Sequence, residues 1–385
     1  MERRLRPVVL TCAILALATA AAPVRPLPLP VPELGTLRGH VETLASPEFE
    51  GRSGPGAQKA AEYVEKALRE LALEPLFDGS YTQPIPGREP GQVQGRNIGA
   101  KLIGADPAVR DEWIILSAHF DHLGVKNGVL YPGADDNASG VAMLLESARC
   151  LAQGPEKPRR SIMFIGFDLE EIGLFGSRYF IEHSPVPLEH VKLFLTADMI
   201  GRSLGGVCEP YLFVIGSEHA PSLRTWVEQA SANRPLQVGL LGTDIVGTRS
   251  DYGPFRHHKI PYLFFSTGEN PCYHSPEDKA ATLNYPKLEA ASSLILDVAR
   301  KAASADALPA WTDPPSYAFS EAIVLRDVIR TLLDHQKELR IHPPQTMLMR
   351  NTLRNLDPII ERGSIRPSER SALVRVAQLV LISVL

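Results

Sequence analysis

Five short stretches of the chain carry carboxylates, and in four of them the carboxylates lie beside histidines or beside one another. They are AHFDHLG (118–124), GADDNASG (133–140), DLEEIGLFGS (168–177), ADMIGR (197–202) and YHSPED (273–278). Each stretch alone is ordinary, because an Asp after a strand commonly caps a turn and paired glutamates commonly occupy a solvated helix end. Brought together, they would form a dense negative site that needs a cation to be stable.

The types of side chain point to zinc chemistry. A mixed set of imidazoles and carboxylates suits Zn²⁺. The five stretches offer at least five such ligands, which is too many for a single tetrahedral ion that must keep one position open. Two ions that share a bridging carboxylate fit this number, and paired metals are a known arrangement for hydrolysis. The sequence therefore indicates a two-metal hydrolytic centre, provided that the fold gathers these stretches.

Alternating strands and helices predict that the fold does gather them. Apolar runs predict strands at 112–118, 161–167, 191–197, 211–216 and 261–266. Amphipathic spacing predicts helices at 56–73, 139–154, 219–232 and 286–302, and a further helix from about Gly173, whereas 77–97 is expected to be a loop. This alternation predicts an α/β fold with a largely parallel sheet covered by helices on both faces. In such sheets ligands bind beyond the carboxyl ends of the strands, and the acidic stretches lie there.

The two ends of the chain differ from this middle part. Residues 1–20 are typical of a secretory signal, with a basic start, an apolar run and small residues for cleavage, and the proline-rich residues 21–34 predict an extended tether. We expect a catalytic domain over 35–304 and a helical extension over 305–385, whose helices are predicted at 319–339, 346–361 and 367–384. No apolar run has the length of a membrane-spanning helix. We therefore expect a periplasmic or secreted protein without stable membrane insertion.

Charge and cysteine content add two expectations. The formal net charge of −4 gives no sign of a nucleic-acid-binding protein. Three cysteines follow the predicted signal, and one disulfide is possible in an exported protein. We expect Cys208 to pair with Cys272, because Cys150 lies on a predicted apolar helix.

In their order and their amino-acid sequence, the five stretches resemble the motifs of the zinc-dependent aminopeptidases of peptidase family M28. The stretch RSDYGPF (249–255) also resembles that family. The resemblance covers about 44–302. It implies a mixed sheet that is parallel in its middle and sandwiched by helices, two zinc ions, and hydrolysis of N-terminal residues from peptides. It also implies five metal ligands: His119 and Asp198 for one ion, Glu171 and His274 for the other, and Asp136 as the bridge.

Three further roles follow from the resemblance. Glu170 corresponds to the general base, which takes a proton from water and passes it to the leaving amine. Asp121 corresponds to the acid that orients the imidazole of His119. Tyr273 corresponds to a hydroxyl donor beside the reacting carbonyl.

Some neighbouring residues are better explained without a catalytic role. We expect His122 to be a hydrogen-bonded loop residue. Arg202 and Asp251 would either bind substrate or pair within the rim of the site, and we expect the pairing. His257 and His258 follow a predicted exposed turn and should face solvent.

Other functions stay open on the sequence alone. A metallocarboxypeptidase or dipeptidase of the same fold would use similar metals but would need basic groups for a C-terminal carboxylate. A glutaminyl cyclase would work with one metal. A non-catalytic ectodomain with this fold would be expected to lose ligands, whereas here the whole set is present, and this favours a hydrolase.

Overall fold

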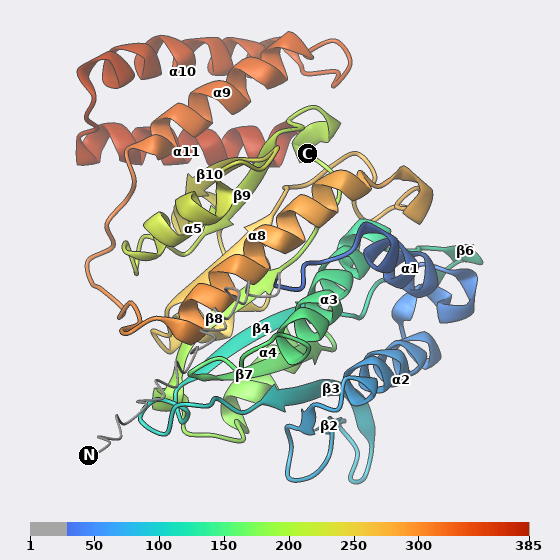
Figure 1. Ribbon diagram of the computed structural model, residues 1–385. Coiled ribbons are helices and arrows are strands. Elements are labelled where there is room, and N and C mark those ends of the chain that lie inside the picture. Colours follow the sequence, from blue (N-terminus) through green and yellow to red (C-terminus); the bar gives the residue numbers. More distant parts are fainter. Residues whose placement is uncertain (1–28, 385) are drawn as a thin grey trace, which may run out of the picture.

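The computed structural model describes residues 29–384 and contains a nine-stranded sheet between layers of helices (Figure 1). The predicted signal (1–20) and most of the predicted tether lie outside the described residues. The sheet has the strand order β1-β3-β7-β4-β8-β11-β9-β10, and β2 pairs with β3. The strands are β1 (Glu74–Pro75), β2 (Thr82–Pro86), β3 (Val93–Leu102), β4 (Trp113–His119), β7 (Ser161–Phe167), β8 (Val191–Ala197), β9 (Tyr211–Ile215), β10 (Gln237–Leu241) and β11 (Tyr262–Ser266), with a separate hairpin of β5 (Val125–Lys126) and β6 (Val129–Leu130).

The middle of the sheet is parallel and its edges are mixed. β7, β4, β8 and β11 are parallel neighbours. β3 runs antiparallel to β7, and β9 runs antiparallel to β11 while pairing in parallel with β10. This arrangement confirms the predicted fold class, a mixed α/β sheet sandwiched by helices.

Alternating side chains of the central strands build two apolar cores, one on each face of the sheet. In β4, Ile114 and Leu116 face the core that includes α3 and α8, whereas Ile115 faces the core that includes α4 and α7. The helices are α1 (Leu34–Leu44), α2 (Pro55–Glu70), α3 (Gly140–Ala152), α4 (Phe175–Glu182), α5 (Leu223–Ser231), α6 (Thr243–Val246), α7 (Tyr252–His257), α8 (Tyr285–Ser304), α9 (Ser320–Asp334), α10 (Pro343–Arg362) and α11 (Pro367–Val384).

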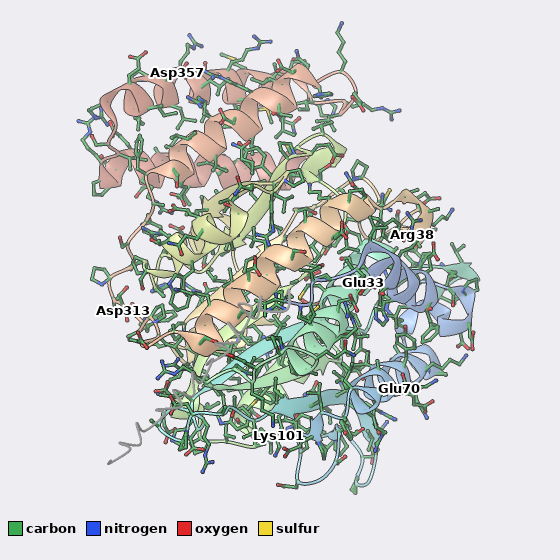
Figure 2. The ribbon with its side chains drawn as sticks, viewed as in Figure 1. Glu33, Arg38, Glu70, Lys101, Asp313 and Asp357 are labelled. Carbon is green, nitrogen blue, oxygen red and sulfur yellow. The ribbon has the colours of Figure 1, made fainter. Side chains whose placement is uncertain are left out.

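Three C-terminal helices form a layer beside β9 and β10 (Figure 1). α9 packs on β10, α10 packs on α9 and α11, and α11 also contacts α6. Charged side chains lie on the outer faces of these and other helices, as Glu70 on α2 and Asp357 on α10 show (Figure 2). Within residues 29–384, no helix combines the length and the apolar character that crossing a membrane requires.

One sequence expectation about the first third of the chain was wrong, and one helix there was not expected. The expected loop at 77–97 contains β2 and the start of β3. Pro84 and Pro86 argued against a strand, so β2 was not predicted. The strand tolerates both prolines because it pairs with β3 alone and leaves its other side unpaired. The sequence also did not predict α1, which begins at Leu34, the last residue of the expected tether.

The expected disulfide between Cys208 and Cys272 is also wrong, because Cys150, Cys208 and Cys272 are all free thiols. Cys208 is 1% exposed and belongs to the apolar core that α9 covers. Burial raises the pKa of the Cys208 thiol to about 12, so it stays protonated and unreactive. Cys272 lies half-buried in the loop that follows β11.

Candidate active site

The four parallel strands deliver the candidate ligands to one edge of the sheet. His119 is the last residue of β4, Asp198 follows β8 directly, and Glu171 lies four residues beyond the end of β7. His274 lies in the loop after β11, and Asp136 lies in the turn that leads into α3. Because these strands are neighbours with the same direction, their carboxyl ends bring all five side chains together.

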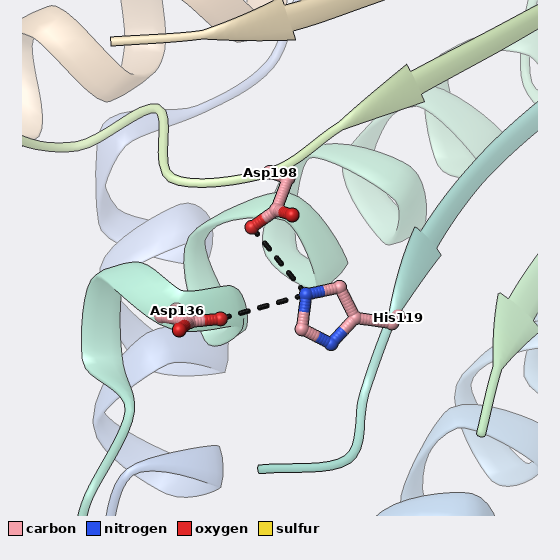
Figure 3. A group of neighbouring side chains, drawn as sticks. All are labelled: His119, Asp136 and Asp198. Atoms are coloured by element: carbon pink, nitrogen blue, oxygen red, sulfur yellow. Dashed lines mark ion pairs between the residues drawn. The ribbon is translucent and has the colours of Figure 1, made fainter. Parts of the chain in front are cut away.

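A first donor group consists of His119, Asp136 and Asp198 (Figure 3). The Nε2 atom of His119 lies 3.5 Å from Asp136 Oδ1 and 3.4 Å from Asp198 Oδ1. All three residues are buried. Among the described residues, neither His119 Nε2 nor Asp198 Oδ1 has a hydrogen-bond partner. Buried polar atoms without partners are costly, so this group is suited to a bound cation.

A second donor group uses the other oxygen of Asp136. The Nε2 atom of His274 lies 3.2 Å from Asp136 Oδ2 and 3.1 Å from Glu171 Oε2. The Nδ1 atom of His122 lies 2.7 Å from Glu171 Oε1 and 3.8 Å from Asp136 Oδ2. His122 is therefore hydrogen-bonded, as expected, and its partner Glu171 is a candidate ligand. His122, Asp136 and Glu171 lie close enough together to hold one metal ion.

The site holds more carboxylates than imidazoles. Burial raises the pKa of Glu170 well above its usual range, and burial with repulsion from Glu171 raises that of Asp136. Burial alone would raise the pKa of Glu171, but hydrogen bonds with His122 and His274 outweigh it and hold this pKa well below its usual range. Burial alone would lower the pKa of His274, but hydrogen bonds to Asp136 and Glu171 raise it to about 10. Divalent cations at this site would offset the excess of buried carboxylate charge.

Asp121 positions the two glutamates as well as the imidazole. Its Oδ1 accepts the backbone N–H of Glu170 at 3.1 Å, and its Oδ2 accepts that of Glu171 at 3.2 Å. Its Oδ1 also lies 3.5 Å from His119 Nδ1. The hydrogen bond to His119 Nδ1 involves the backbone carbonyl of Asp121, at 3.2 Å, so the orienting role of its carboxylate stays a prediction. The contact of that carboxylate with the glutamate loop is a role that the sequence did not suggest.

Arg52 is a supporting residue that could not be singled out from the sequence. It is fully buried, and its guanidinium donates to five backbone carbonyls, those of Leu44, Phe120, Pro132, Gly133 and Asp136. These bonds fix the turn that carries Asp136 and the segment after His119. No pattern in the sequence distinguishes this arginine from an exposed one.

Asp278 supports the same turn from the opposite side. Its carboxylate accepts the backbone N–H groups of Asp135 and Asp136 at 3.0–3.1 Å and pairs with Arg202 at 3.1 Å. The pairing of Arg202 agrees with the sequence expectation. Asp278 is the last residue of YHSPED, so the motif contained it, but its role depends on a contact 142 residues away along the chain.

The backbone is unusual at three points of the site. Leu169, Met199 and His274 have φ angles of 60°, 55° and 51°. These left-handed conformations are disfavoured for residues with a side chain, and they cluster where a structure constrains a functional site. Leu169 precedes Glu170, and Met199 follows Asp198, so the unusual conformations set the directions of candidate catalytic and metal-binding groups.

Three other residues singled out in the sequence lie at or near the site. The ring of Tyr273 stacks on that of His274, with centroids 3.9 Å apart. Asp251 is fully buried, and within 29–384 neither carboxylate oxygen has a hydrogen-bond partner, so the expected pairing in the rim was wrong. Burial raises the pKa of Asp251 to about 7. His257 is exposed, as expected, and so is its neighbour His258.

Comparison with known proteins gives the family of the chain. The family model described as Peptidase family M28 matches residues 97–299, a range that contains all five candidate ligands. The chain is 29% identical over 190 residues to aminopeptidase YwaD of Bacillus subtilis (strain 168), covering 47% of this chain and 39% of that protein. It is 31% identical over 166 residues to a probable zinc metalloprotease of Leptosphaeria maculans, covering 42% of this chain and 37% of the relative. The match thus spans about two fifths of the length of these relatives.

Solved structures share the fold. The crystal structure of the LapA aminopeptidase of Legionella pneumophila superposes with a TM-score of 0.56 at 22% identity, covering 71% of this chain and 72% of that one. A glutaminyl cyclase of Porphyromonas gingivalis has the same TM-score at 19% identity, covering 69% of this chain and 97% of that one. At these sequence identities the likeness shows the shared fold only. The reaction has to be inferred from the residues of the site.

Proposed function

Because the chain belongs to peptidase family M28, we propose that it is an exported zinc aminopeptidase that removes N-terminal residues from peptides with two metal ions. One observation carries the proposal. The carboxylate of Asp136 is shared, with Oδ1 facing His119 and Oδ2 facing His274, so that two donor groups meet at one bridge. A bridging carboxylate between two groups of mixed donors is what a pair of divalent ions requires.

Each ion has an assigned set of residues. His119, Asp198 and Asp136 would hold one ion, and Glu171, His274 and Asp136 the other. The donor types fit zinc, and the unpartnered atoms of the first group would gain a partner. The ions, when bound, would supply an activated water and polarise the scissile carbonyl.

Glu170 is the proposed general base. Asp121 holds its backbone N–H, and its carboxylate is left out of both donor groups. In this role Glu170 accepts a proton from the attacking water and donates it to the amine that leaves. Tyr273, stacked on His274, is proposed as a donor to the oxygen of the reacting carbonyl.

The charge around the site favours a substrate amine over a substrate carboxylate. Glu170 lines the cavity beside the donor groups without belonging to either, and its carboxylate would attract an ammonium group. Arg249 also lines the cavity, but it is paired with Glu269 at 2.7 Å. A carboxypeptidase would need an uncompensated base at this place. The names of the relatives, an aminopeptidase and a zinc metalloprotease, agree with this choice.

The experiment compares blocked and free peptides on the purified protein after metal removal and titration with zinc. We expect hydrolysis of leucine p-nitroanilide but not of its N-acetyl form, with activity saturating at two zinc ions per chain by elemental analysis. Release of a C-terminal residue from an N-blocked peptide would point to a carboxypeptidase. Saturation at one ion with cyclisation of N-terminal glutamine would point to a cyclase, and inactivity toward every substrate would point to a non-catalytic protein.

A further inference from the structure

One cavity of about 140 Å³ connects the candidate active site with the C-terminal helices. Its polar end is lined by Glu170, Glu171, Asp198 and His274. Its other end is lined by apolar side chains, and six of them come from α9 and α11: Val324, Leu325, Val328, Ile329, Leu332 and Ala377. All six belong to the part of the chain that follows residues 97–299, the range of the family model.

We propose that α9 and α11 complete the pocket for the side chain of the substrate's N-terminal residue and thereby make this chain selective for apolar N-termini. The inference rests on the proposed function, since it assigns the substrate class of the same site. It gives the C-terminal helices a specificity-determining role in addition to packing.

The chemistry of the pocket favours an apolar occupant. Phe213, Ile215 and Phe264 line it from the sheet, opposite the helices. An apolar side chain gains by leaving water for such a surface, whereas a charged one would lose its hydration without finding a partner. Arg249 and Glu269, which also line this cavity, form an ion pair and neutralise each other.

The helical wall is held firmly against the sheet. A β-carbon added at Gly239 of β10 would lie 3.1 Å from Val324 Cγ1, so α9 sits close to the strand. The carboxylate of Glu321 accepts the backbone N–H of Gly242 at 2.7 Å and a hydrogen bond from Arg370 Nε on α11 at 2.6 Å. These contacts make α9 and α11 a fixed wall whose side chains define the shape of the pocket.

The test is a substitution on α9 that makes the pocket smaller, with a substitution on the same helix outside the pocket as the control. Val328 lines the cavity, whereas Leu333 is equally buried but does not line it. We expect the wild type to hydrolyse phenylalanine and leucine p-nitroanilides faster than those of lysine, glutamate and alanine. In Val328→Phe, the ratio of kcat/KM for the phenylalanine substrate to that for the alanine substrate should fall by about tenfold or more, the usual range for apolar pockets. Leu333→Phe should leave this ratio unchanged.

A binding measurement separates this proposal from the proposed function. In a Glu170→Gln background, L-phenylalaninamide should bind more tightly than L-alaninamide by calorimetry, and adding Ala377→Leu from α11 should reduce the difference. Hydrolysis with a preference for charged N-termini, or a Val328→Phe ratio equal to that of wild type, would overturn the inference while leaving the aminopeptidase intact. Absence of hydrolysis together with selective binding would instead overturn the proposed function alone. If Val328→Phe fails to fold, as judged by its melting, the Ala377→Leu binding result decides, and equal binding of the two amides would overturn the pocket.

Discussion

Two clusters of buried charge in this molecule differ in how their charges are balanced. Between α9, α11 and α6, Arg370 donates to Glu321 and Asp244 at 2.6 Å each, and its guanidinium lies over the ring of Tyr317. At the carboxyl edge of β4 and β8, His119 Nε2 and Asp198 Oδ1 are buried at 3.4 Å from each other and lack hydrogen-bond partners within the described residues.

The difference separates a structural cluster from a binding site. Around Arg370 each charged group has a hydrogen-bond partner within the protein, since one guanidinium donates to two carboxylates, and such a cluster fixes one arrangement of the helices. Around Asp136 carboxylates outnumber imidazoles, and the atoms that point inward are left for something else to satisfy. Removing one charged side chain should therefore destabilise the protein at the Arg370 cluster. At the Asp136 cluster it should leave the metal-free protein as stable and reduce metal binding.

The largest effect is expected for Glu170→Gln. The amide cannot accept the proton of the attacking water, so kcat should fall by about 10²–10⁴-fold. Zinc content and melting temperature should stay close to wild type, because Glu170 belongs to neither donor group. Steady-state kinetics on leucine p-nitroanilide with elemental analysis measures both. Glu182→Gln, an exposed glutamate on α4, serves as the control. Turnover at the wild-type rate in Glu170→Gln would remove the base from the mechanism.

The next effect concerns the balanced cluster. Arg370→Met leaves Glu321 buried without its counter-charge, which should lower the free energy of unfolding by about 3–5 kcal/mol. Urea denaturation measures it. Arg366→Met is the control on the same segment, because Arg366 is exposed and pairs with Glu369 at the surface, and it should cost less than about 1 kcal/mol. Equal small losses in the two variants would mean that the Arg370 cluster does not hold the helices.

Asp136→Asn should not destabilise the metal-free protein, in contrast to Arg370→Met. Without metal, removal of a negative charge from an acidic site should leave the protein at least as stable as wild type. With zinc at about a hundred times the dissociation constant, wild type should gain about 2.7 kcal/mol for each bound ion, and the variant should lose most of this gain. Thermal melting with and without zinc, together with metal content, measures the pair of effects. A variant that binds zinc like wild type would contradict the bridging role.

The sequence predicted the centre of this site because periodicity and strand ends are local properties. Apolar runs located β4, β7, β8 and β11, and the residues after them became candidate ligands. β2 was missed because Pro84 and Pro86 are compatible with a strand only when it lies at an edge, which is a property of the sheet.

The supporting residues could not be predicted for a similar reason. Arg52 is recognised only through carbonyls up to 84 positions away, and Asp278 only through N–H groups more than 140 positions away. The helical spacing of α9 was visible in the sequence, but which face of the helix meets the cavity depends on how it docks on β10. His122 shows the same limit, since its contact with Glu171 joins two strand ends.

The smallest effect on stability is expected for substitution of Lys287, a single buried base on α8. It is 5% exposed, and within the described part of the chain its Nζ has no hydrogen-bond partner. Burial lowers the pKa of Lys287 from 10.5 to about 8, which corresponds to about 3 kcal/mol against folding at pH 7. Between these two values the unfolded chain binds more protons than the folded one, so this contribution to stability rises with pH. Lys287→Met should therefore stabilise the protein by about 1–3 kcal/mol at pH 7, and the gain should shrink toward pH 10.5. Urea denaturation at pH 7 and pH 10 tests this, with Lys301→Met on the exposed face of α8 as the control. A loss of stability at pH 7 would mean that the ammonium of Lys287 is balanced by acids nearby, and that this base belongs with the matched cluster of Arg370.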